Sequence, residues 1–468
     1  MAELWARGAG ALAAAIAAGE VSSREVIEAH LARIEAVNPV VNAVTVVLAD
    51  SALEAADAAD RAVAAGQALG PLHGVPFTVK ENIDLAGTAT TNGLVALADA
   101  IAPLDAPQVS RLRAAGGIPI GRTNLPDLGL RVHTDNELRG LTRNPWHPGR
   151  TASGSSGGEA VAHATGMSPL GLGNDIGGSL RNPAYCCGTT ALKPTVGRIG
   201  HAGSVPPTEP MLAEQLMAVQ GPMARHVADV RPAFSLLAGR DPRAPLSVPA
   251  PLDGPPVPSP IRVAVCTDPA GGGVHPSVAE GVRRAADVLT DAGYDVVEAE
   301  PPSIAEAVEV WQRILASDLD HLRPLVWDLM SADSRRFLEL NEERTPVPTG
   351  EQVFFDHYAR VRIAQEWQRF SLEHPVTVGP VWSTPPFEVG YDIAGADEAA
   401  DVIQRLRLVV AINLVGVPAA VVPVGVADGL PQGVQIVADR FREDLCLDVA
   451  ATLEDALGVI TPVDPVTA

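Results

Sequence analysis

Two glycine-rich segments of the chain place serine hydroxyls among small residues. The first reads Ser153-Gly154-Ser155-Ser156-Gly157-Gly158, and the second reads Gly173-Asn174-Asp175-Ile176-Gly177-Gly178-Ser179-Leu180-Arg181. Glycine neighbours remove side-chain bulk and permit unusual backbone angles, so a substrate can approach both a hydroxyl and the adjacent N–H groups. A nucleophile beside backbone donors is typical of acyl-transfer sites.

Three interpretations of these serines compete. Ser156 fits the G-x-S-x-G nucleophile elbow, but that elbow needs a strand directly before the serine, and residues 143–153 are polar and contain proline. Both segments could instead be flexible surface loops, although residues 159–171 between them are as apolar as a buried helix. The third interpretation takes Ser179 as the nucleophile, with the N–H groups of residues 176–179 holding a developing oxyanion.

A serine nucleophile needs a base, and no histidine is close to Ser179 in the sequence. Residues 72–84 read as a buried strand that carries Lys80 at its end. Burial would lower the pKa of this lysine and make a neutral amine available, and Ser155 could relay the proton from Ser179. A lysine at the edge of an apolar run is also commonly a surface group, so the residues alone leave this role open.

The elements that must position these residues alternate between strand and helix patterns, which favours an α/β fold. A capping box at Ser22 and Glu25 predicts a helix from Ser23 to about Val37, ended by Asn38-Pro39. We expect strands at 43–49, 72–84, 118–121, 190–198, 261–265, 295–297 and 433–437, and helices at 51–65, 109–115, 226–237, 278–292 and 443–457. Residues 303–373 read as largely helical, 408–426 as a helix turning into a core strand, and 240–260 as a proline-rich excursion.

The composition excludes several classes of function. With 468 residues and a formal net charge of −22, the chain has no basic cluster for nucleic acid or an anionic membrane. Its four cysteines form no C-x-x-C pair, which argues against a disulfide framework or a zinc site and favours the cytoplasm. We find no nucleotide-binding or metal motif, and so expect no cofactor and no metal. Residues 12–18 read as a helix rather than a signal peptide, and no run is long enough to span a membrane.

The two serine loops resemble the signature of the amidase signature family. Other stretches agree with that family, and the similarity is dense from about 70 to 200, sparse from 240 to 400, and returns from 408 to 455. The agreeing stretches are Gly74-Val75-Pro76, Lys80-Glu81-Asn82, Arg122-Thr123-Asn124, Thr142-Arg143-Asn144-Pro145, Cys187-Gly188, Leu192-Lys193-Pro194-Thr195, Gly197-Arg198, Asn413-Leu414, Gly416, Pro418, Gly429-Leu430-Pro431 and Gly433-Val434-Gln435.

The resemblance implies a Ser-cisSer-Lys triad. Ser179 would be the nucleophile, Ser155 the proton relay preceded by a cis peptide bond, and Lys80 the base. The N–H groups of Ile176, Gly177, Gly178 and Ser179 would form the oxyanion hole, and Gly154, Ser156, Asp175 and Arg181 would support the loops. Ser153 stands where many members have Gly and Asn174 where Thr or Ser is common, and we expect neither to touch the triad.

The resemblance also implies a fold, an organisation and an activity. We expect one amidase domain over 1–468, with a twisted mixed sheet covered by helices on both faces. Within it, 1–66 would be N-terminal helices, 67–235 the signature core, and 261–468 the part that completes the sheet and the pocket. The helices of 303–373 and residues 382–391 would close that pocket.

The expected activity is hydrolysis of a small-molecule amide, with esters or carbamates as further substrates, through an acyl-enzyme. An alternative is the glutamine-hydrolysing subunit of an amidotransferase that supplies ammonia to a partner. We disfavour it because 303–373 lacks the tyrosine- and arginine-rich pattern of that subunit. Dimers are common in the family, so the resemblance allows a homodimer.

Overall fold

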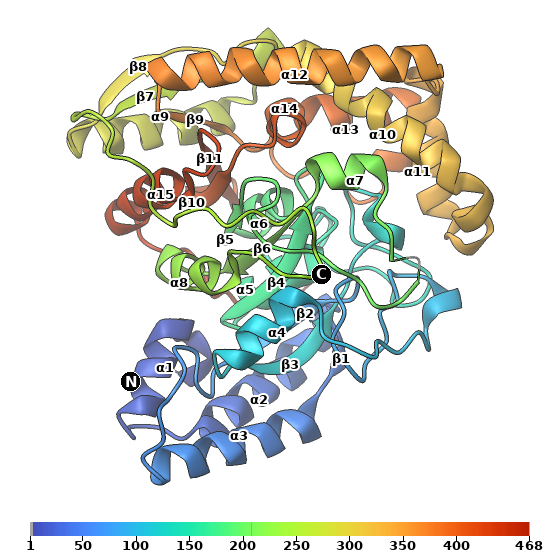
Figure 1. Cartoon of the computed structure of the whole chain (residues 1–468). Helices are drawn as coiled ribbons and strands as arrows, with labels where there is room; N and C mark the ends of the chain where they lie inside the picture. The colour runs from blue at the N-terminus through green and yellow to red at the C-terminus, as the bar shows by residue number, and fades with distance from the viewer. Residues whose placement is uncertain (1–2, 207, 468) are drawn as a thin grey trace.

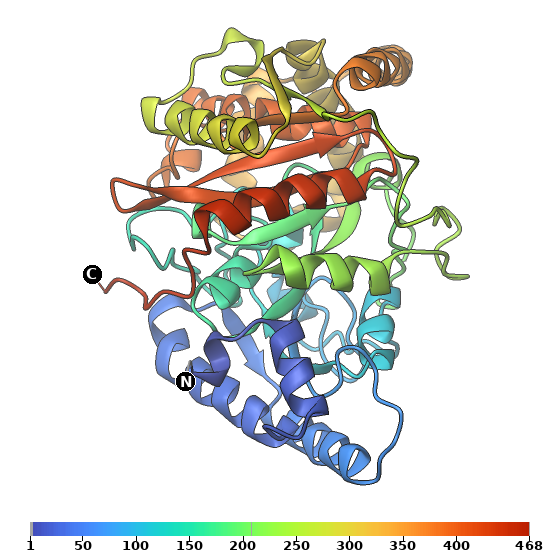
Figure 2. The same cartoon turned by 90° about the vertical axis from the view of Figure 1, so that its left-hand side faces the viewer.

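The structure, a computed structural model, describes residues 3–206 and 208–467. An 11-stranded mixed sheet runs through the centre of the molecule, with helices on both faces (Figures 1 and 2). Its order is β1-β3-β2-β4-β6-β5-β10-β11-β9-β7-β8, which confirms the predicted α/β class and mixed sheet. The strands are β1 (Val44–Val47), β2 (Pro76–Lys80), β3 (Ile118–Thr123), β4 (Leu170–Asp175), β5 (Thr190–Lys193), β6 (Val219–Ala224), β7 (Arg262–Val265), β8 (Asp295–Glu298), β9 (Val376–Pro380), β10 (Ala419–Ala427) and β11 (Leu430–Ala438).

Two hydrophobic clusters cover the two faces of this sheet. The first gathers side chains from α2, α5, α6, α10 and α14, and the second gathers side chains from α1, α4, α8, α9 and α15. The helices are α1 (Ala9–Ala17), α2 (Ser23–Val41), α3 (Ala49–Ala64), α4 (Pro107–Ala114), α5 (Gly157–Ala164), α6 (Arg181–Cys187), α7 (Leu212–Met217), α8 (Val227–Leu237), α9 (Pro276–Asp291), α10 (Ile304–Val326), α11 (Ala332–Arg344), α12 (Gly350–Glu373), α13 (Ala396–Arg405), α14 (Arg407–Val415) and α15 (Glu443–Leu457).

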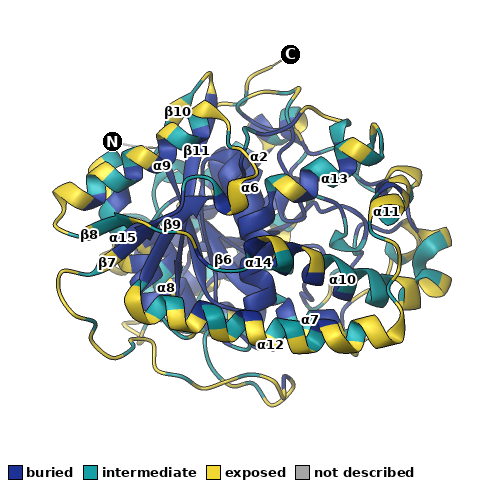
Figure 3. Ribbon diagram, turned by 90° about the horizontal axis from the view of Figure 1, so that it is seen from above, coloured by how far each residue is buried: buried dark blue, intermediate teal, exposed yellow. Residues whose placement is uncertain are grey.

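Several strands of the sheet are buried along their whole length. Every residue of β2, β3, β6, β9 and β11 is buried, because helices shield both faces of the sheet. The same shielding buries all of α14 and α6 in the middle of the molecule, whereas α12 lies on the outside with much of its surface exposed (Figure 3). The site is therefore held by a close-packed core, and the outer helix α12 is not part of it.

Three parallel neighbours bring the signature residues to one edge of the sheet. Strand β2 pairs in parallel with β3 on one side and with β4 on the other, with Val79 opposite Leu172 of β4. The carboxyl ends of parallel strands meet at the same edge, where α/β folds usually hold their sites. Lys80 ends β2 and Asp175 ends β4, so both side chains lie at this edge.

Most of the predicted elements are present, and three expectations need correction. Helix α2 does not end at Asn38-Pro39: it continues to Val41, which is buried like Val37, and closes at Asn42 with a left-handed φ of 52°. Residues 159–171 are not one helix, because α5 ends at Ala164 and β4 begins at Leu170. Strands β4, β6 and β9 and helices α6, α7 and α13 are not predicted. Apart from α13, these segments have five to seven residues and carry too little periodicity to identify.

Within residues 3–206 and 208–467, no helix is both long and apolar enough to cross a membrane. All four cysteines are buried with free thiols. The proline-rich excursion at 240–260 is tied to the core, because Arg198 donates hydrogen bonds to the carbonyls of Ala250 and Pro251.

Candidate active site

Lys80 is a buried amine at the end of β2. Its Nζ lies 2.7 Å from Ser155 Oγ and 2.7 Å from Asn174 Oδ1. Burial lowers the pKa of Lys80 from 10.5 to about 7, although the charges of Asp175 and Glu159 oppose that shift. A large share of this lysine is therefore neutral near pH 7 and able to accept a proton.

Ser155 follows a cis peptide bond with Gly154, directly before α5. A Cβ on Gly154 would lie 2.6 Å from the carbonyl oxygen of Arg131, so no larger residue fits there without a shift of the backbone. The Ser155 side chain lies beside the Lys80 amine and is almost fully buried. A hydrogen bond between these groups can run either way, with an ammonium donating to the hydroxyl or a neutral amine accepting from it.

Ser179 lies in the loop between β4 and α6. Its exposed fraction is 8%, against 2% for Ser155 and 0% for Lys80, and it lines a cavity. The N–H of Ser156 donates to the carbonyl of Ser179 at 3.2 Å, so the two serine loops lie against one another. The structure thus brings the two glycine-rich segments together, with the Ser179 loop nearer the cavity and Ser155 nearer the lysine.

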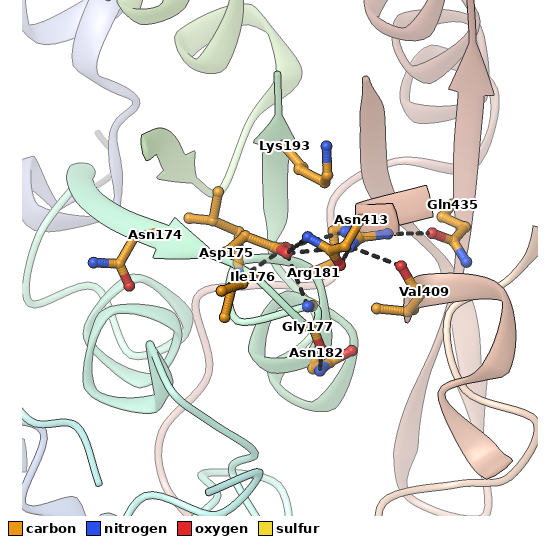
Figure 4. Close-up of polar contacts among 12 residues, drawn as sticks. Asn174, Asp175, Ile176, Gly177, Arg181, Asn182, Lys193, Val409, Asn413 and Gln435 are labelled. Atoms are coloured by element: carbon orange, nitrogen blue, oxygen red, sulfur yellow. Dashed lines mark hydrogen bonds and ion pairs between the residues drawn. The ribbon is translucent and has the colours of Figure 1, made fainter. Parts of the chain in front are cut away.

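The Asp175 carboxylate fixes the shape of the Ser179 loop (Figure 4). It accepts the N–H of Gly178 at 2.8 Å and the N–H of Leu180 at 3.2 Å. The Arg181 guanidinium donates to both of its oxygens, at 3.0 and 3.2 Å, and Asn413 of α14 donates at 2.8 Å. Burial alone would raise the pKa of Asp175, but Arg181, Lys193 and Asn413 outweigh it and hold the pKa at about 2. The carboxylate is therefore ionised throughout the neutral pH range.

Two side chains hold the carbonyl groups of the same loop. Trp311 Nε1 of α10 donates to the carbonyl of Ile176 at 2.9 Å, and Asn182 Nδ2 donates to the carbonyl of Gly177 at 3.0 Å. Within the described part of the chain, the N–H groups of Ile176, Gly177 and Ser179 meet no acceptor, whereas that of Gly178 is taken by Asp175. Three free backbone donors thus lie around the Ser179 position.

A cavity of about 150 Å³ opens beside Ser179. Its walls come mainly from α10, α11 and the segment between them, and they carry apolar and aromatic side chains: Trp311, Leu315, Leu319, Trp327, Met330 and Phe337. Two arginines also line it, and both are paired: Arg131 with Asp392 at 2.6 Å, and Arg323 with Glu342 at 2.6 Å. The cavity therefore suits an apolar group rather than a free anion.

Two expectations about the site are wrong. Asn174 does touch Lys80, because its side chain points away from Asp175 on the strand and toward β2 (Figure 4). Residues 382–391 do not line the cavity: Trp382 is buried and donates to Asn182 Oδ1, while α10 and α11 form the wall. Nothing in the sequence points to Trp311, which contacts the loop from a region of weak family resemblance.

Comparisons with known proteins agree with this geometry. The sequence matches the Amidase family over residues 25–447. It is 44% identical over 460 residues to the indoleacetamide hydrolase of Bradyrhizobium diazoefficiens, covering 98% of this chain and 88% of that relative. It is 33% identical over 499 residues to a glutamyl-tRNA(Gln) amidotransferase subunit of Salinispora arenicola, covering 99% of each. A solved 6-aminohexanoate cyclic dimer hydrolase superimposes with a TM-score of 0.84 at 31% identity, covering 97% of this chain and 98% of that one.

The chain therefore belongs to the amidase signature family of amide-hydrolysing enzymes, as its serine loops predicted. A bacterial aryl acylamidase of the same family also shares the fold, with a TM-score of 0.81 at 25% identity, covering 96% of each chain.

Proposed function

We propose that this enzyme hydrolyses a carboxamide with an apolar, aryl-bearing acyl group, of the indoleacetamide type, to the carboxylic acid and ammonia. The observation that carries the proposal is the apolar, aromatic cavity beside Ser179, next to the Lys80–Ser155 pair. The 44% identity to an indoleacetamide hydrolase supports the same substrate class. An aryl ring buries a large apolar area, and such a wall stabilises it.

In the proposed first step, neutral Lys80 takes the proton of Ser155 while Ser155 takes that of Ser179. The Ser179 oxygen then attacks the amide carbon, and the carbonyl electron pair moves to oxygen. We assign the oxyanion hole to the N–H groups of Ile176, Gly177 and Ser179, because Gly178 N–H already donates to Asp175. The tetrahedral intermediate collapses as the Lys80 ammonium returns its proton through Ser155 to the leaving nitrogen, which departs as ammonia.

The second half of the proposed reaction repeats these roles with water. A water molecule gives its proton to Ser155 and Lys80 and attacks the acyl-enzyme ester. Collapse of this second intermediate breaks the bond to Ser179, which regains a proton, and releases the acid. One water is consumed, one amide bond is broken and no oxidant or cofactor is needed.

A substrate panel tests this proposal. We would measure ammonia release from indole-3-acetamide, phenylacetamide, hexanamide, acetamide and glutamine, with Ser179→Ala as the blank and Ser235→Ala, on the surface of α8, as the matched control. We expect kcat/KM to be highest for the two aryl amides, and Ser179→Ala to lose about 10⁴- to 10⁶-fold in kcat. Retention of activity by Ser179→Ala would exclude the triad. A preference for acetamide or hexanamide would exclude the aryl assignment.

Glutamine is in the panel because a subunit of an amidotransferase is among the relatives. Its α-carboxylate needs a free cation, and both arginines of the cavity wall are already paired with carboxylates. We therefore expect glutamine to be a poor substrate. Efficient glutamine hydrolysis would instead favour the ammonia-supplying role.

A further inference from the structure

The last two residues of β4 serve different parts of the site. Neighbouring side chains on a strand point to opposite sides, and Figure 4 shows Asn174 pointing away from the Asp175 network. Asp175 holds the loop that carries Ser179, whereas Asn174 faces Lys80. The strand thus connects the nucleophile loop with the base.

The orientation of the Asn174 amide is fixed at both of its ends. Its Oδ1 accepts from Lys80 Nζ at 2.7 Å, and its Nδ2 donates to Asn82 Oδ1 at 3.0 Å. Asn82 follows Lys80 by two residues, so the amide spans the end of β2. In this arrangement Asn82 accepts from the NH₂ end of Asn174, and the carbonyl end of Asn174 is left for the lysine. The backbone of Asn174 is held independently by its pairing with Gln220 of β6.

We propose that Asn174 is a positioning residue for the base: its carbonyl holds one N–H of the Lys80 amine so that the nitrogen lone pair faces Ser155 Oγ, and Asn82 keeps that carbonyl in place. This inference rests on the proposed roles of Lys80, Ser155 and Ser179. A neutral amine has two N–H groups and one lone pair. A fixed acceptor for one N–H removes rotations about the last bond of the side chain that would turn the lone pair away from the hydroxyl.

The same carbonyl also affects how tightly Lys80 holds its proton. A carbonyl oxygen stabilises an ammonium more than a neutral amine, so the contact favours the protonated state. The other charged groups around Lys80 are Glu81, the next residue in the chain, Glu159 of α5, Asp175 at the end of β4, and Arg122 of β3. The Arg122 guanidinium donates to the Lys80 carbonyl. None of these groups hydrogen-bonds to Nζ, so removal of the Asn174 carbonyl should lower the pKa of Lys80.

The experiment compares Asn174→Leu, which keeps the approximate shape but accepts no hydrogen bond, with Asn174→Asp, which adds a negative charge. The first readout is kcat and KM for the best amide of the panel between pH 5 and 10. The second is the rate of inactivation by phenylmethylsulfonyl fluoride, which needs no amide substrate. In that reaction Ser179 Oγ forms a bond to sulfur, fluoride leaves, and the serine proton passes to Ser155 and Lys80.

We expect Asn174→Leu to lose about 10- to 100-fold in both kcat and the inactivation rate, with KM little changed. The acid limb of its kcat–pH profile should move to lower pH, whereas the acid limb of the Asn174→Asp profile should move to higher pH. A merely structural role would lower both rates without opposite displacements of the limb. Equal rates and an unmoved limb in Asn174→Leu would overturn the inference.

Asn82→Ala provides a second route, because it leaves Asn174 in place and removes only the group that orients it. We expect a smaller loss, about 3- to 10-fold, in the same two rates. Unchanged rates would contradict the role of Asn82. Asn82→Ala also tests the inference if Asn174→Leu fails to fold. Lys80→Ala and Ser179→Ala, measured in parallel, separate the two proposals: if they remain active, the triad is wrong, and if they are inactive while Asn174→Leu is normal, only the positioning role is wrong.

Discussion

The two walls of the candidate active site are built in different ways. The wall from β2, β4 and the serine loops is rich in buried polar groups, and several of them are held by hydrogen bonds from another element, such as the contacts of Lys80 with Ser155 and Asn174. The wall from α10 and α11 is mainly apolar, and its side chains act by filling space beside the cavity. Polar groups act through direction and charge, whereas apolar groups act through area. Changes in the first wall should therefore alter kcat, and changes in the second should alter KM and the choice of substrate.

One residue belongs to both walls. Trp311 lines the cavity with its ring and donates its Nε1–H to the carbonyl of Ile176. In a trans peptide the carbonyl and the next N–H point in opposite directions, so anchoring the Ile176 carbonyl also orients the N–H of Gly177. A Cβ on Gly177 would lie 2.7 Å from the Trp311 ring, so the glycine permits this close approach.

The largest of the effects that test this comparison distinguishes Lys80 of the polar wall from Lys193, a second buried lysine at the end of β5. Burial is the main cause that lowers the pKa of both Lys80 and Lys193 to about 7. Lys193, however, donates to the carbonyls of Pro194 and Val417 and contacts neither serine hydroxyl. We expect Lys80→Met to lose about 10²- to 10⁴-fold in kcat and Lys193→Met to remain active, as measured by ammonia release from indole-3-acetamide.

The pH profile sharpens this comparison. Lys80 must be neutral to accept a proton, so kcat/KM should rise about tenfold per pH unit below its pKa of about 7 and level off above it. The measurement is kcat/KM between pH 5 and 9 for wild type and Lys193→Met. Both enzymes should show the same fall in kcat/KM at acid pH. If this fall disappears in Lys193→Met, the titrating group is Lys193 and not Lys80.

The residues of the polar wall can be found in the sequence because their signals are local, but only the resemblance to the amidase signature family assigns them roles. Glycines next to serines and a lysine at the end of an apolar run are visible within a few residues. The contact of Asn174 with Lys80 is not local, since the two residues are 94 positions apart. It depends on the register of β4 against β2, and a shift of one residue would turn Asn174 to the other face.

The apolar wall could be predicted only as a region. The sequence predicts that residues 303–373 are helical and close the pocket, and α10 and α11 do so, but the outer helix α12 does not line it. Trp382 and Phe387 have side chains that would suit the pocket, yet their rings stack on one another at 5.3 Å inside the core. Aromatic residues fit a cavity or a core equally well, and only the packing of the whole chain decides between them.

A smaller effect is expected at the junction of the two walls. Trp311→Phe keeps an aromatic ring but leaves the Ile176 carbonyl without its donor, so we expect about a 10-fold loss of kcat with KM changed by less than about twofold. The matched control is Trp367→Phe in α12, because Trp367 is also buried and its Nε1 has no partner within the described residues. Steady-state kinetics of both variants with indole-3-acetamide provide the test. Equal losses would mean that ring packing, rather than the hydrogen bond, matters.

The smallest expected effect lies in the apolar wall itself. Leu319→Ala enlarges the cavity without touching the serine loops, so KM for the aryl amides should rise about 3- to 10-fold while kcat stays within about twofold. Leu325→Ala on the same helix is the control, because Leu325 is 71% exposed and does not line the cavity. Acetamide lacks the aryl group that the Leu319 side chain would contact, so its kinetics should not change in either variant. A fall in kcat for acetamide in Leu319→Ala would show that the apolar wall also holds the catalytic loop, and the division of roles between the two walls would then fail.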